Sequence, residues 1–330
     1  MTRSVKQAAL LFLEQNRHKD VSGEELAQRL GVSRSAVWKA VRALRKDGYE
    51  IFAATNRGYR LAPGSDTLSE QGIRLRLPPG CASLSAAILV EKSMDSTNRA
   101  AKLLALEGAA HGTLVLAEGQ TGGRGRFLRP FFSPAGTGLY MSLVLRPEAR
   151  GADATLITIA AAIAVCRTIK ALTSFAPQIK WVNDIYLDGK KICGILTEAT
   201  SDFESGGVTS VVVGIGLNYN TREDEFPPEL RDRAGSLFPD GKAAISRNAF
   251  AAALVCELLR LCESGALAAR DFLCEYRALS CVIGRMVEYT KDGACRRARA
   301  VGIDDDGRLL VEDAQGGVSA LFSGEVSLTL

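Results

Sequence analysis

The period at which apolar residues recur changes along the chain and divides it into three parts. Up to residue 48 they recur every three or four positions, the period of an amphipathic helix. From about residue 86 short apolar runs alternate with helical stretches, and from Val282 short runs alternate with turns such as Asp306-Gly307. We therefore expect a helical domain over residues 1–63, a larger α+β domain over residues 64–281, and a small all-β domain over residues 282–330.

Capping residues locate three helices in the first part. Ser22 and Glu25 form an S-x-x-E capping box at the start of the second helix, which Gly31 ends. Ser33 is placed to cap the third helix. After the helices, two short strand patterns flank Thr55-Asn56-Arg57-Gly58, which predicts a hairpin, or wing. The expected elements are helices over residues 5–16, 22–30 and 34–46, and strands over residues 49–54 and 59–61.

The third helix has a basic face. Its apolar residues recur at helical spacing and are expected to pack inward. Residues 1–62 contain 12 Lys and Arg against 6 Asp and Glu, and no acidic residue occurs between Leu26 and Lys46. A basic helix that shortly follows a helix ending in glycine is the helix-turn-helix arrangement. The residues expected to contact DNA are Arg34, Ser35, Trp38, Lys39, Arg42 and, on the wing, Arg57.

A small helical domain with a solvated charged face would also carry such basic residues. The capped helix pair, the short turn, the one-sided charge and the wing together favour DNA binding. Phosphate contacts would supply much of the affinity, and Ser35, Trp38 and Lys39 are the candidates to reach base edges. The first part is therefore predicted to be a winged helix-turn-helix domain, and Ala62-Pro63-Gly64-Ser65-Asp66 a linker.

Strand and helix patterns alternate in the second part, and several strands are joined by tight turns. Adjacent hairpins with helices on one side predict an α+β sheet rather than a doubly wound one. The expected strands cover residues 88–91, 112–118, 139–145, 179–181, 185–187, 191–197 and 208–215, and the expected helices residues 99–107, 155–172, 248–264 and 268–279.

Composition narrows the class of protein. Apolar residues make up 47% of the chain and charged residues 24%, which is ordinary for a globular protein. No run reaches the roughly 18 apolar residues of a membrane helix, and no signal peptide is recognised, so we expect a cytoplasmic protein without membrane association. The 8 cysteines have no C-x-x-C pair and only 2 histidines accompany them, so no metal site is expected. Reduced core thiols are expected instead.

One loop of the second part is rich in glycine and arginine, with the sequence Gly122-Gly123-Arg124-Gly125-Arg126. Glycine lets a backbone approach a ligand closely, and the two arginines can bind phosphate or carboxylate oxygens. The loop is neither a P-loop nor a dinucleotide fingerprint, so a nucleotide would have to be held in another way. Mobile basic loops are common, and the loop alone is weak evidence for function.

Three further motifs follow at strand ends. Lys180-Trp181-Val182-Asn183-Asp184 and Lys191-Ile192-Cys193-Gly194-Ile195-Leu196 bring lysines, an Asn and an Asp to one hairpin. A lone Lys or Asp there would more often be a solvated turn residue. In Gly214-Ile215-Gly216-Leu217-Asn218, two glycines near the end of an apolar strand leave room for a ligand ring, although the strand could equally be core only.

With Asp95-Ser96-Thr97-Asn98 and Phe132-Ser133-Pro134, these motifs resemble the bifunctional biotin–protein ligases that also repress biotin operons, the BirA type. Their order and spacing fit along almost the whole chain, and five motifs in register are far more specific than one. The resemblance implies a winged helix-turn-helix, a central mixed-sheet catalytic domain similar to biotin and lipoate ligases, and a C-terminal SH3-like β-barrel.

The resemblance also implies a two-step reaction, that of a biotin–[acetyl-CoA-carboxylase] ligase. Biotin attacks the α-phosphorus of ATP, bound with Mg²⁺, to give biotinoyl-5'-AMP and pyrophosphate. A lysine of the biotin carboxyl carrier protein then takes the biotin and releases AMP. The family's second role implies operator DNA as a partner, biotin as the precursor of the co-repressor, and a ligand-promoted homodimer.

The family's functional residues are carried over to the matching motif positions. The catalytic residues are then Lys191 and Arg124, which supply positive charge where carboxylate meets phosphate, and Asp184, which orients or deprotonates the incoming lysine. By the same resemblance, biotin is expected to contact Ser96, Thr97, Asn98, Gln120, Arg124, Lys191, Leu196 and Ile215, and the adenylate to contact Gly123, Arg124, Gly125, Arg126, Asn183 and Asn218.

The chain departs from the family pattern at three places. Phe127-Leu128-Arg129 stands where the basic loop often continues as Arg-Gly-Arg, which affects loop closure and adenylate retention. Val182 stands where Pro is usual, and Phe131 where Trp is frequent. Two other functions share many of these features: a DNA-binding biotin sensor with vestigial ligase activity, and a lipoate or octanoate ligase. The presence of Lys191, Arg124 and Asp184 argues against the first, and the loop sequences against the second.

Overall fold

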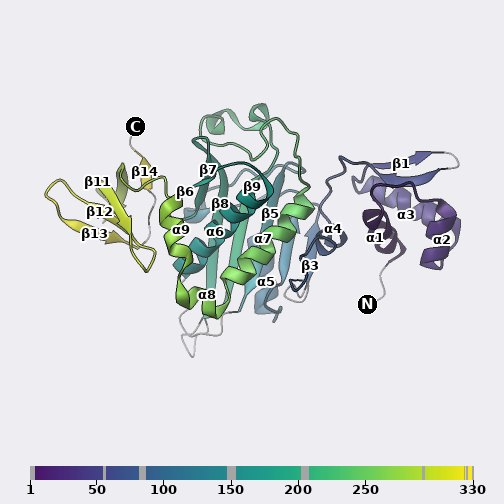
Figure 1. Cartoon of the computed structure of the whole chain (residues 1–330), viewed down its shortest axis with the longest axis horizontal. Coiled ribbons are helices and arrows are strands. Elements are labelled where there is room, and N and C mark those ends of the chain that lie inside the picture. The colour runs from purple at the N-terminus through teal and green to yellow at the C-terminus, as the bar shows by residue number, and fades with distance from the viewer. Residues whose placement is uncertain are drawn as a thin grey trace. The chain divides into compact units, whose positions relative to one another are not determined.

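A computed structural model of the chain describes residues 4–54, 57–81, 87–146, 154–201, 208–291, 294–322, 324 and 326–328. The chain divides into two compact units (Figure 1). The first comprises Met1–Ala82 and Ile245–Ala253, and the second comprises Ser83–Ala244 and Leu254–Leu330. Thr55 and Asn56, at the tip of the expected wing, lie outside the described residues.

Helices α1 (Val5–Gln15), α2 (Gly23–Leu30) and α3 (Arg34–Lys46) precede a hairpin of β1 (Ile51–Ala54) and β2 (Gly58–Leu61). The serine half of each predicted cap is present. The Ser22 hydroxyl accepts a hydrogen bond from the Glu25 backbone N–H, and the Ser33 hydroxyl accepts one from the Ala36 backbone N–H. Gly31 ends α2 with a φ of 66°, a left-handed conformation that favours glycine. The predicted winged helix-turn-helix is confirmed.

The segment after the hairpin is tied down within the first unit. It contains the short helix α4 (Glu70–Arg74), which the sequence pattern did not predict. The start of α7 (Arg247–Leu261) holds it through side chains. Arg247 Nε lies 3.1 Å from Asp66 Oδ2, and the Asn248 amide bonds to Ser69 N and Thr67 O. The segment interpreted as a linker is therefore packed at Asp66 and beyond.

The second unit is built on a seven-stranded mixed sheet in the order β3-β4-β5-β9-β8-β7-β6. Only the β3–β4 pair is parallel, and each other neighbouring pair is antiparallel. The prediction of an α+β sheet is confirmed. The strands are β3 (Ile88–Glu91), β4 (Leu114–Ala117), β5 (Gly138–Leu145), β6 (Gln178–Lys180), β7 (Asp184–Leu187), β8 (Lys190–Ser201) and β9 (Val208–Asn218).

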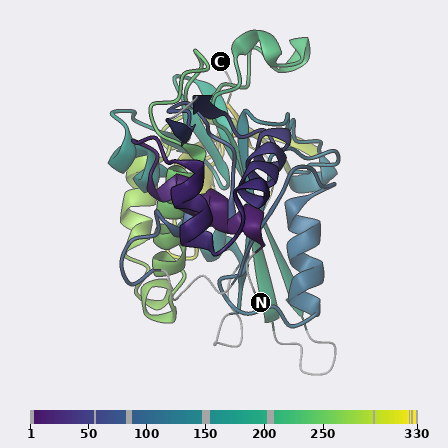
Figure 2. The same ribbon diagram turned by 90° about the vertical axis from the view of Figure 1, so that its right-hand side faces the viewer.

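The expectation that the helices lie on one side of this sheet is wrong: they cover both faces, with α5 (blue) on one side of the strands and the green helices on the other (Figure 2). Helix α5 (Thr97–Leu106) packs through Ala101 and Ala105 against residues of β4, β5 and β9. Helix α6 (Ala154–Leu172) packs on the opposite face. It is long and apolar enough to cross a membrane by length and composition, but 72% of its apolar window is buried inside the protein. It is therefore a core helix.

The helix expected over residues 268–279 is two helices, and that prediction was wrong. Helix α8 (Ser264–Ala269) ends at Arg270, which has a φ of 57°, and α9 (Phe272–Leu279) follows. A left-handed residue cannot continue a right-handed helix. Arg270 instead donates to Asp305 O and Asp306 Oδ1, and these tertiary contacts were not visible in the apolar pattern.

The last part of the chain forms a five-stranded antiparallel sheet in the order β13-β12-β11-β10-β14. This confirms the predicted C-terminal β domain. Its strands are β10 (Met286–Lys291), β11 (Ala294–Ile303), β12 (Leu309–Glu312), β13 (Val318–Leu321) and β14 (Val326–Leu328).

The expectation that all cysteines are reduced is wrong for two of them. Cys81 and Cys256 are disulfide-bonded, whereas the other six are free. Sequence spacing identifies C-x-x-C pairs but not which sulfurs meet in the folded chain. Of the free thiols, Cys166 and Cys262 are buried, and burial raises the pKa of each to about 12.

Candidate functional site

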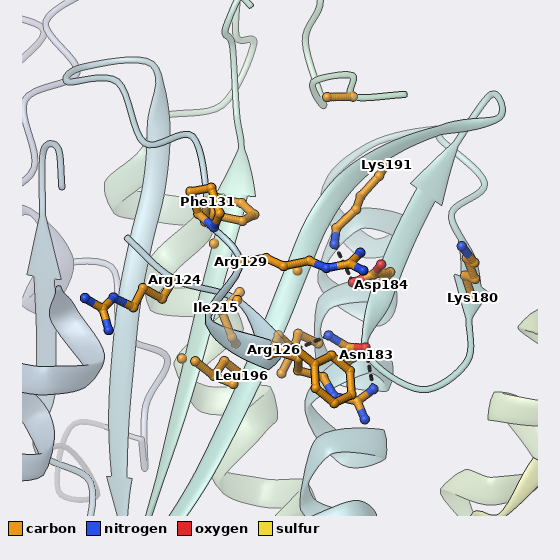
Figure 3. Close-up of a pocket in the computed structure, with 18 of the residues that line it drawn as sticks. Arg124, Arg126, Arg129, Phe131, Lys180, Asn183, Asp184, Lys191, Leu196 and Ile215 are labelled. Atoms are coloured by element: carbon orange, nitrogen blue, oxygen red, sulfur yellow. Dashed lines mark hydrogen bonds and ion pairs between the residues drawn. The ribbon is translucent and has the colours of Figure 1, made fainter. Parts of the chain in front are cut away.

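A cavity of about 520 Å³ lies over the central sheet of the second unit (Figure 3). It contains every residue expected to be catalytic or to contact biotin. Of the residues expected at the adenylate, Gly123 and Asn218 are not among the lining residues, and Asn218 is instead buried, with its amide donating to Gly235 O. The predicted residues that line the cavity are Ser96, Thr97, Asn98, Gln120, Arg124, Gly125, Arg126, Asn183, Asp184, Lys191, Leu196 and Ile215.

One end of the cavity is cationic. Lys191 Nζ lies 2.6 Å from Asp184 Oδ1, across the β7–β8 hairpin. Beside this pair, an Arg126 guanidinium nitrogen donates to Asn183 Oδ1 at 3.3 Å, and the Asn183 amide nitrogen donates to Ile195 O at 2.8 Å. Figure 3 also shows Arg129 directed toward the Lys191–Asp184 pair. Several cations around one carboxylate suit an anionic ligand such as a phosphate or carboxylate.

Arg124 is placed differently from the other cations. It is exposed and lines the cavity, but its guanidinium points away from Lys191 and Asp184 (Figure 3). A ligand that used Arg124 and Lys191 together would require the Arg124 side chain to turn. The structure therefore brings Lys191 and Asp184 into contact and leaves Arg124 apart from them.

Another wall of the cavity is polar and uncharged. Ser96 caps α5, and Thr97 begins the helix. The backbone N–H of Thr97 donates to Gln120 Oε1 at 2.9 Å, and Gln120 Nε2 donates to Ser133 Oγ at 3.1 Å. These bonds orient the Gln120 amide. This wall can offer hydrogen bonds to a neutral polar group.

The floor of the cavity is apolar and flat. Gly194 of β8 and Gly216 of β9 are paired directly across the two strands. The Phe131 ring lies above this glycine pair: a Cβ added to Gly216 would come within 2.6 Å of it. Leu196 and Ile215 complete the apolar surface. Gly214 and Gly216 were expected to leave room for a ligand ring, but in this structure the space over them is occupied by the side chains of Asn98 and Phe131.

The loop that carries the arginines is closed by its own backbone. Gly125 N donates to Arg129 O at 2.8 Å, and Phe131 N donates to Gly123 O at 2.9 Å. Between these bonds, Phe127 and Leu128 have φ values of 55° and 58° and are 64% and 76% exposed. The family pattern has a glycine in this stretch, and the left-handed backbone here is one that glycine adopts without steric cost.

Burial and hydrogen bonding perturb the acidity of two groups behind the site. Burial disfavours the charged form of Glu198, but hydrogen bonds from Lys102 and Asn98 outweigh it, so the pKa of this carboxyl lies below its usual value. Burial raises the pKa of Tyr276 well above its usual value, and its hydroxyl donates to Val182 O at 3.0 Å. The Trp181–Val182 peptide bond is cis.

Some lining residues were not predicted. Tyr186 and Arg233 line the cavity, as do Val326 and Ser327 of the C-terminal sheet. Lys180 lies within a recognised motif, and Phe131 was named only as a departure from the family pattern; neither was given a role. Arg233 lies in the stretch between β9 and α7, where no motif marks it. Since strand β14 is remote in sequence, only the fold shows that it reaches the cavity.

The first unit presents the residues expected to contact DNA. Arg34, Ser35, Lys39 and Arg42 are exposed on α3, and Trp38 is 53% exposed. The Arg42 guanidinium lies 5.4 Å from the centre of the Trp38 ring, and Ser35 Oγ is 2.9 Å from the capping Ser33 Oγ.

On the wing, Arg57 Nε lies 2.9 Å from Asp20 Oδ2, although the Arg57 side chain is 70% exposed. The expected DNA face is thus one exposed helix face together with an ion-paired wing arginine.

Comparisons with known proteins assign the class to which this fold and site belong. The model of the biotin/lipoate A/B protein ligase family matches residues 90–218, a helix-turn-helix domain model matches residues 5–60, and the biotin protein ligase C-terminal domain model matches residues 282–329. Together these models account for the winged helix-turn-helix, the mixed sheet with the cavity, and the C-terminal β domain.

Full-length relatives narrow the class to one type. The chain is 37% identical to the bifunctional ligase/repressor BirA of Bacillus spizizenii, over 93% of this chain and 94% of that protein. It is 32% identical to BirA of Escherichia coli, over 93% and 92%. The chain belongs to the family of bifunctional biotin ligase/repressors.

A solved structure supports the fold of the second unit. The biotin protein ligase from Aquifex aeolicus in complex with biotin and ATP is 27% identical to this chain, with a TM-score of 0.62. The aligned region covers 74% of this chain and 99% of the Aquifex chain.

Proposed function

We propose that the chain is an ATP-dependent biotin–protein ligase that acts on the biotin carboxyl carrier protein of acetyl-CoA carboxylase, and that it also represses transcription in response to biotin. The observation that carries the ligase role is the single cavity in which five separate sequence motifs meet. Its cationic end suits the phosphates of ATP, which enters with Mg²⁺, and its polar and apolar walls suit the neutral rings of biotin.

The geometry supports different roles for the residues of the cationic end in the first step. A biotin carboxylate oxygen bonds to the α-phosphorus, the bond from that phosphorus to the pyrophosphate oxygen breaks, and pyrophosphate leaves. We assign the Lys191 ammonium to the point where the two anions meet, and such preorganised charge lowers the barrier most when water is excluded. Asp184 holds this ammonium, and Arg126 with Asn183 would contact the adenylate.

The second step transfers the acyl group. A neutral lysine amine of the carrier attacks the acyl carbon, the bond from that carbon to the AMP oxygen breaks, and the amine proton must be accepted. Asp184 is the carboxylate at this end of the cavity, and we assign it to orient the amine or accept the proton. Ser96, Thr97, Asn98, Gln120, Leu196 and Ile215 are assigned to biotin, and Gly123, Gly125 and Asn218 to the support of the adenylate side.

The ligase role is tested with the full chain, ATP, radiolabelled biotin and a carrier domain of acetyl-CoA carboxylase. Label should appear in an acid-labile adenylate without the carrier and on the carrier lysine when the carrier is present. Lipoate and octanoate in parallel reactions separate this function from that of a lipoate ligase. Label on neither product would contradict the ligase role, and adenylate alone would contradict the assigned carrier.

The repressor role is supported by the exposed cations of α3. We propose that Arg34, Ser35, Trp38, Lys39, Arg42 and Arg57 contact operator DNA, and that biotinoyl-5'-AMP promotes a homodimer in the cytoplasm that binds it. Sedimentation velocity with and without biotin and ATP tests the dimer: the sedimentation coefficient should rise only when both are added. An unchanged coefficient would remove ligand-promoted dimerisation from the proposal.

A further inference from the structure

A chain of hydrogen bonds, partly exposed at Lys102 and Glu198 and buried at Ser142, runs behind the polar wall of the cavity. It starts at Lys102 Nζ, which lies 2.8 Å from Glu198 Oε1. Glu198 Oε2 accepts a hydrogen bond from Asn98 Nδ2 at 2.9 Å. Asn98 Oδ1 is 2.6 Å from Ser142 Oγ, which lies 2.8 Å from Thr97 Oγ1. Ser142 is fully buried and does not line the cavity, whereas Thr97 does.

The orientation of the Asn98 amide is determined by groups that can only accept. Its nitrogen faces the Glu198 carboxylate and, at 3.2 Å, the Leu196 carbonyl oxygen. Neither group can donate a proton, because the pKa of the carboxyl lies below its usual value and a carbonyl has no proton. The amide oxygen of Asn98 must therefore face Ser142, and it can only accept.

The hydroxyl groups continue this chain toward the cavity. Ser142 Oγ donates to both Asn98 Oδ1 and Thr97 Oγ1, so its single proton is shared between two acceptors. Thr97 Oγ1 in turn donates to Gln120 Oε1 at 3.2 Å. The Thr97 proton is thus directed to Gln120, and the Thr97 oxygen keeps a lone pair for a ligand in the cavity.

Packing around the Asn98 amide requires glycine at position 214. Gly214 lies beneath the Asn98 amide, and a Cβ added there would come within 1.9 Å of Asn98 Oδ1. Gly214 is the strand partner of both Ser142 and Leu196. The Asn98 amide therefore packs on Gly214, beside two neighbouring strands. A larger residue at position 214 would leave no space for this amide.

We infer that Glu198, Asn98 and Ser142 are positioning residues that set Thr97 Oγ1 as a hydrogen-bond acceptor toward the ligand. This inference rests on the proposed function. Beside Thr97, Gln120 has its Oε1 fixed by Thr97 N, so its Nε2 is the donor. The wall then presents an acceptor next to a donor, the complement of the N–H and C=O of a cyclic urea such as that of biotin. Asn98, which is assigned to the biotin wall, therefore acts on the ligand through Ser142 and Thr97.

A double-mutant cycle with the full chain tests the inference. Biotin binding without ATP is measured by calorimetry for the wild type, Ser142→Ala, Thr97→Val and the double variant. Ser142→Ala should raise the biotin Kd about tenfold, because Thr97 Oγ1 loses the donor that keeps its own proton on Gln120 and its oxygen is no longer held as an acceptor. In the Thr97→Val background the same change should have almost no further effect. The steady-state effect should appear in KM for biotin rather than in kcat.

Ser210→Ala is the matched control. Ser210 is another buried hydroxyl, 2% exposed, on the neighbouring strand β9 and outside the hydrogen-bond chain. Thermal unfolding of each variant shows that it is folded, and the double variant removes both hydroxyls of the pair so that neither is left unpaired.

Each outcome of the cycle decides something. Equal Kd values for Ser142→Ala and Ser210→Ala, or a tenfold effect that persists in the Thr97→Val background, would overturn the positioning role alone. A wild-type chain that does not bind biotin at all would overturn the proposed function and this inference with it. Desthiobiotin retains the urea but lacks the sulfur ring, so its Kd should change by the same factor as that of biotin. A different factor would contradict an effect on the urea.

Discussion

Both units contain a cation held by a carboxylate, and the two pairs differ in their surroundings. On the wing, Arg57 and Asp20 are 2.9 Å apart, and the arginine side chain is 70% exposed. In the cavity, Lys191 and Asp184 are 2.6 Å apart, with side chains 33% and 20% exposed. Water and salt screen the first pair, so it contributes roughly 0–1 kcal/mol and can give way to a phosphate. The second pair is better shielded, so it keeps the ammonium in place.

The same difference extends to the two sites as a whole. Arg34, Lys39 and Arg42 of α3 are exposed, and each can be removed without leaving a buried charge behind. In the ligase cavity, the polar side chains bond to one another and to strand carbonyls, so a change at one position affects the next. An exposed site should therefore lose function in small independent steps, and an enclosed site in large coupled ones.

The largest effect is expected for Lys191→Ala. Loss of one preorganised charge raises a barrier by about 3–4 kcal/mol, or roughly 10²–10³-fold in the rate of adenylate formation. Pyrophosphate release measures this rate. Lys190→Ala is the control, because Lys190 is the adjacent residue and pairs with exposed Glu223 at 2.8 Å. Equal losses in the two variants would remove Lys191 from its assigned role.

The next effect concerns stability. Gly214→Ala should lower the free energy of unfolding by about 1–3 kcal/mol, since the new Cβ overlaps Asn98 Oδ1. Gly64→Ala in the first unit is the comparison: no atom lies within 4 Å of its Cβ position. Urea denaturation measures both. A neutral Gly214→Ala would show that the enclosed site repacks as easily as the surface does.

A moderate effect is expected on the exposed side. Arg34→Ala and Lys39→Ala should each weaken binding to a 30-bp duplex roughly tenfold near 0.1 M salt, and each should lower the salt slope by about 1. The melting temperature and ligation rate should not change. Fluorescence anisotropy over a salt series measures the slope. Lys6→Ala, which removes a cation of α1 paired with Asp47 at 2.7 Å, should leave the slope unaltered. A loss of ligation in either α3 variant would contradict the independence of the DNA-binding site from the ligase site.

The smallest effect is expected for Asp20→Asn. Asp20 Oδ1 also lies 3.5 Å from Arg60 Nε, so this one carboxylate partly neutralises two wing arginines. Its neutral form should raise affinity for the same duplex by about a few fold. The matching change in the cavity, Asp184→Asn, should slow ligation instead. Unchanged or weaker DNA binding by Asp20→Asn would mean that the wing arginines do not reach phosphate.

Much of the fold follows from local pattern, as α3 illustrates. Its bounds, Arg34–Lys46, agree with the prediction because the Ser33 cap and the apolar spacing act within a few residues. The prediction of one helix over residues 268–279 was wrong because the backbone of Arg270 is left-handed. The Arg270 side chain bonds to Asp305 and Asp306, more than 30 residues away in sequence. Local propensity gives way where tertiary contacts oppose it.

The residues of the candidate site were likewise predicted only in part from the sequence. Five motifs identified most of the cavity residues, because glycines, lysines and amides at strand ends stand out from an apolar pattern. Arg233 and Ser327 had no such mark, and the disulfide-bonded state of Cys81 and Cys256 was not visible either. Nothing in the sequence marked Ser142 or Glu198, each of which reads as an ordinary strand residue.

The sequence by itself determined the order of the domains, the caps and faces of the N-terminal helices, and the family to which the ligase motifs belong. Those features depend on residues one to four positions apart, or on short motifs. Tertiary structure alone decided which polar atoms meet. Asn98 and Glu198 are 100 positions apart, and their 2.9 Å contact exists because α5, β5, β8 and β9 pack together. A hydrogen bond needs its two atoms within about 3 Å, a distance that only the folded chain sets.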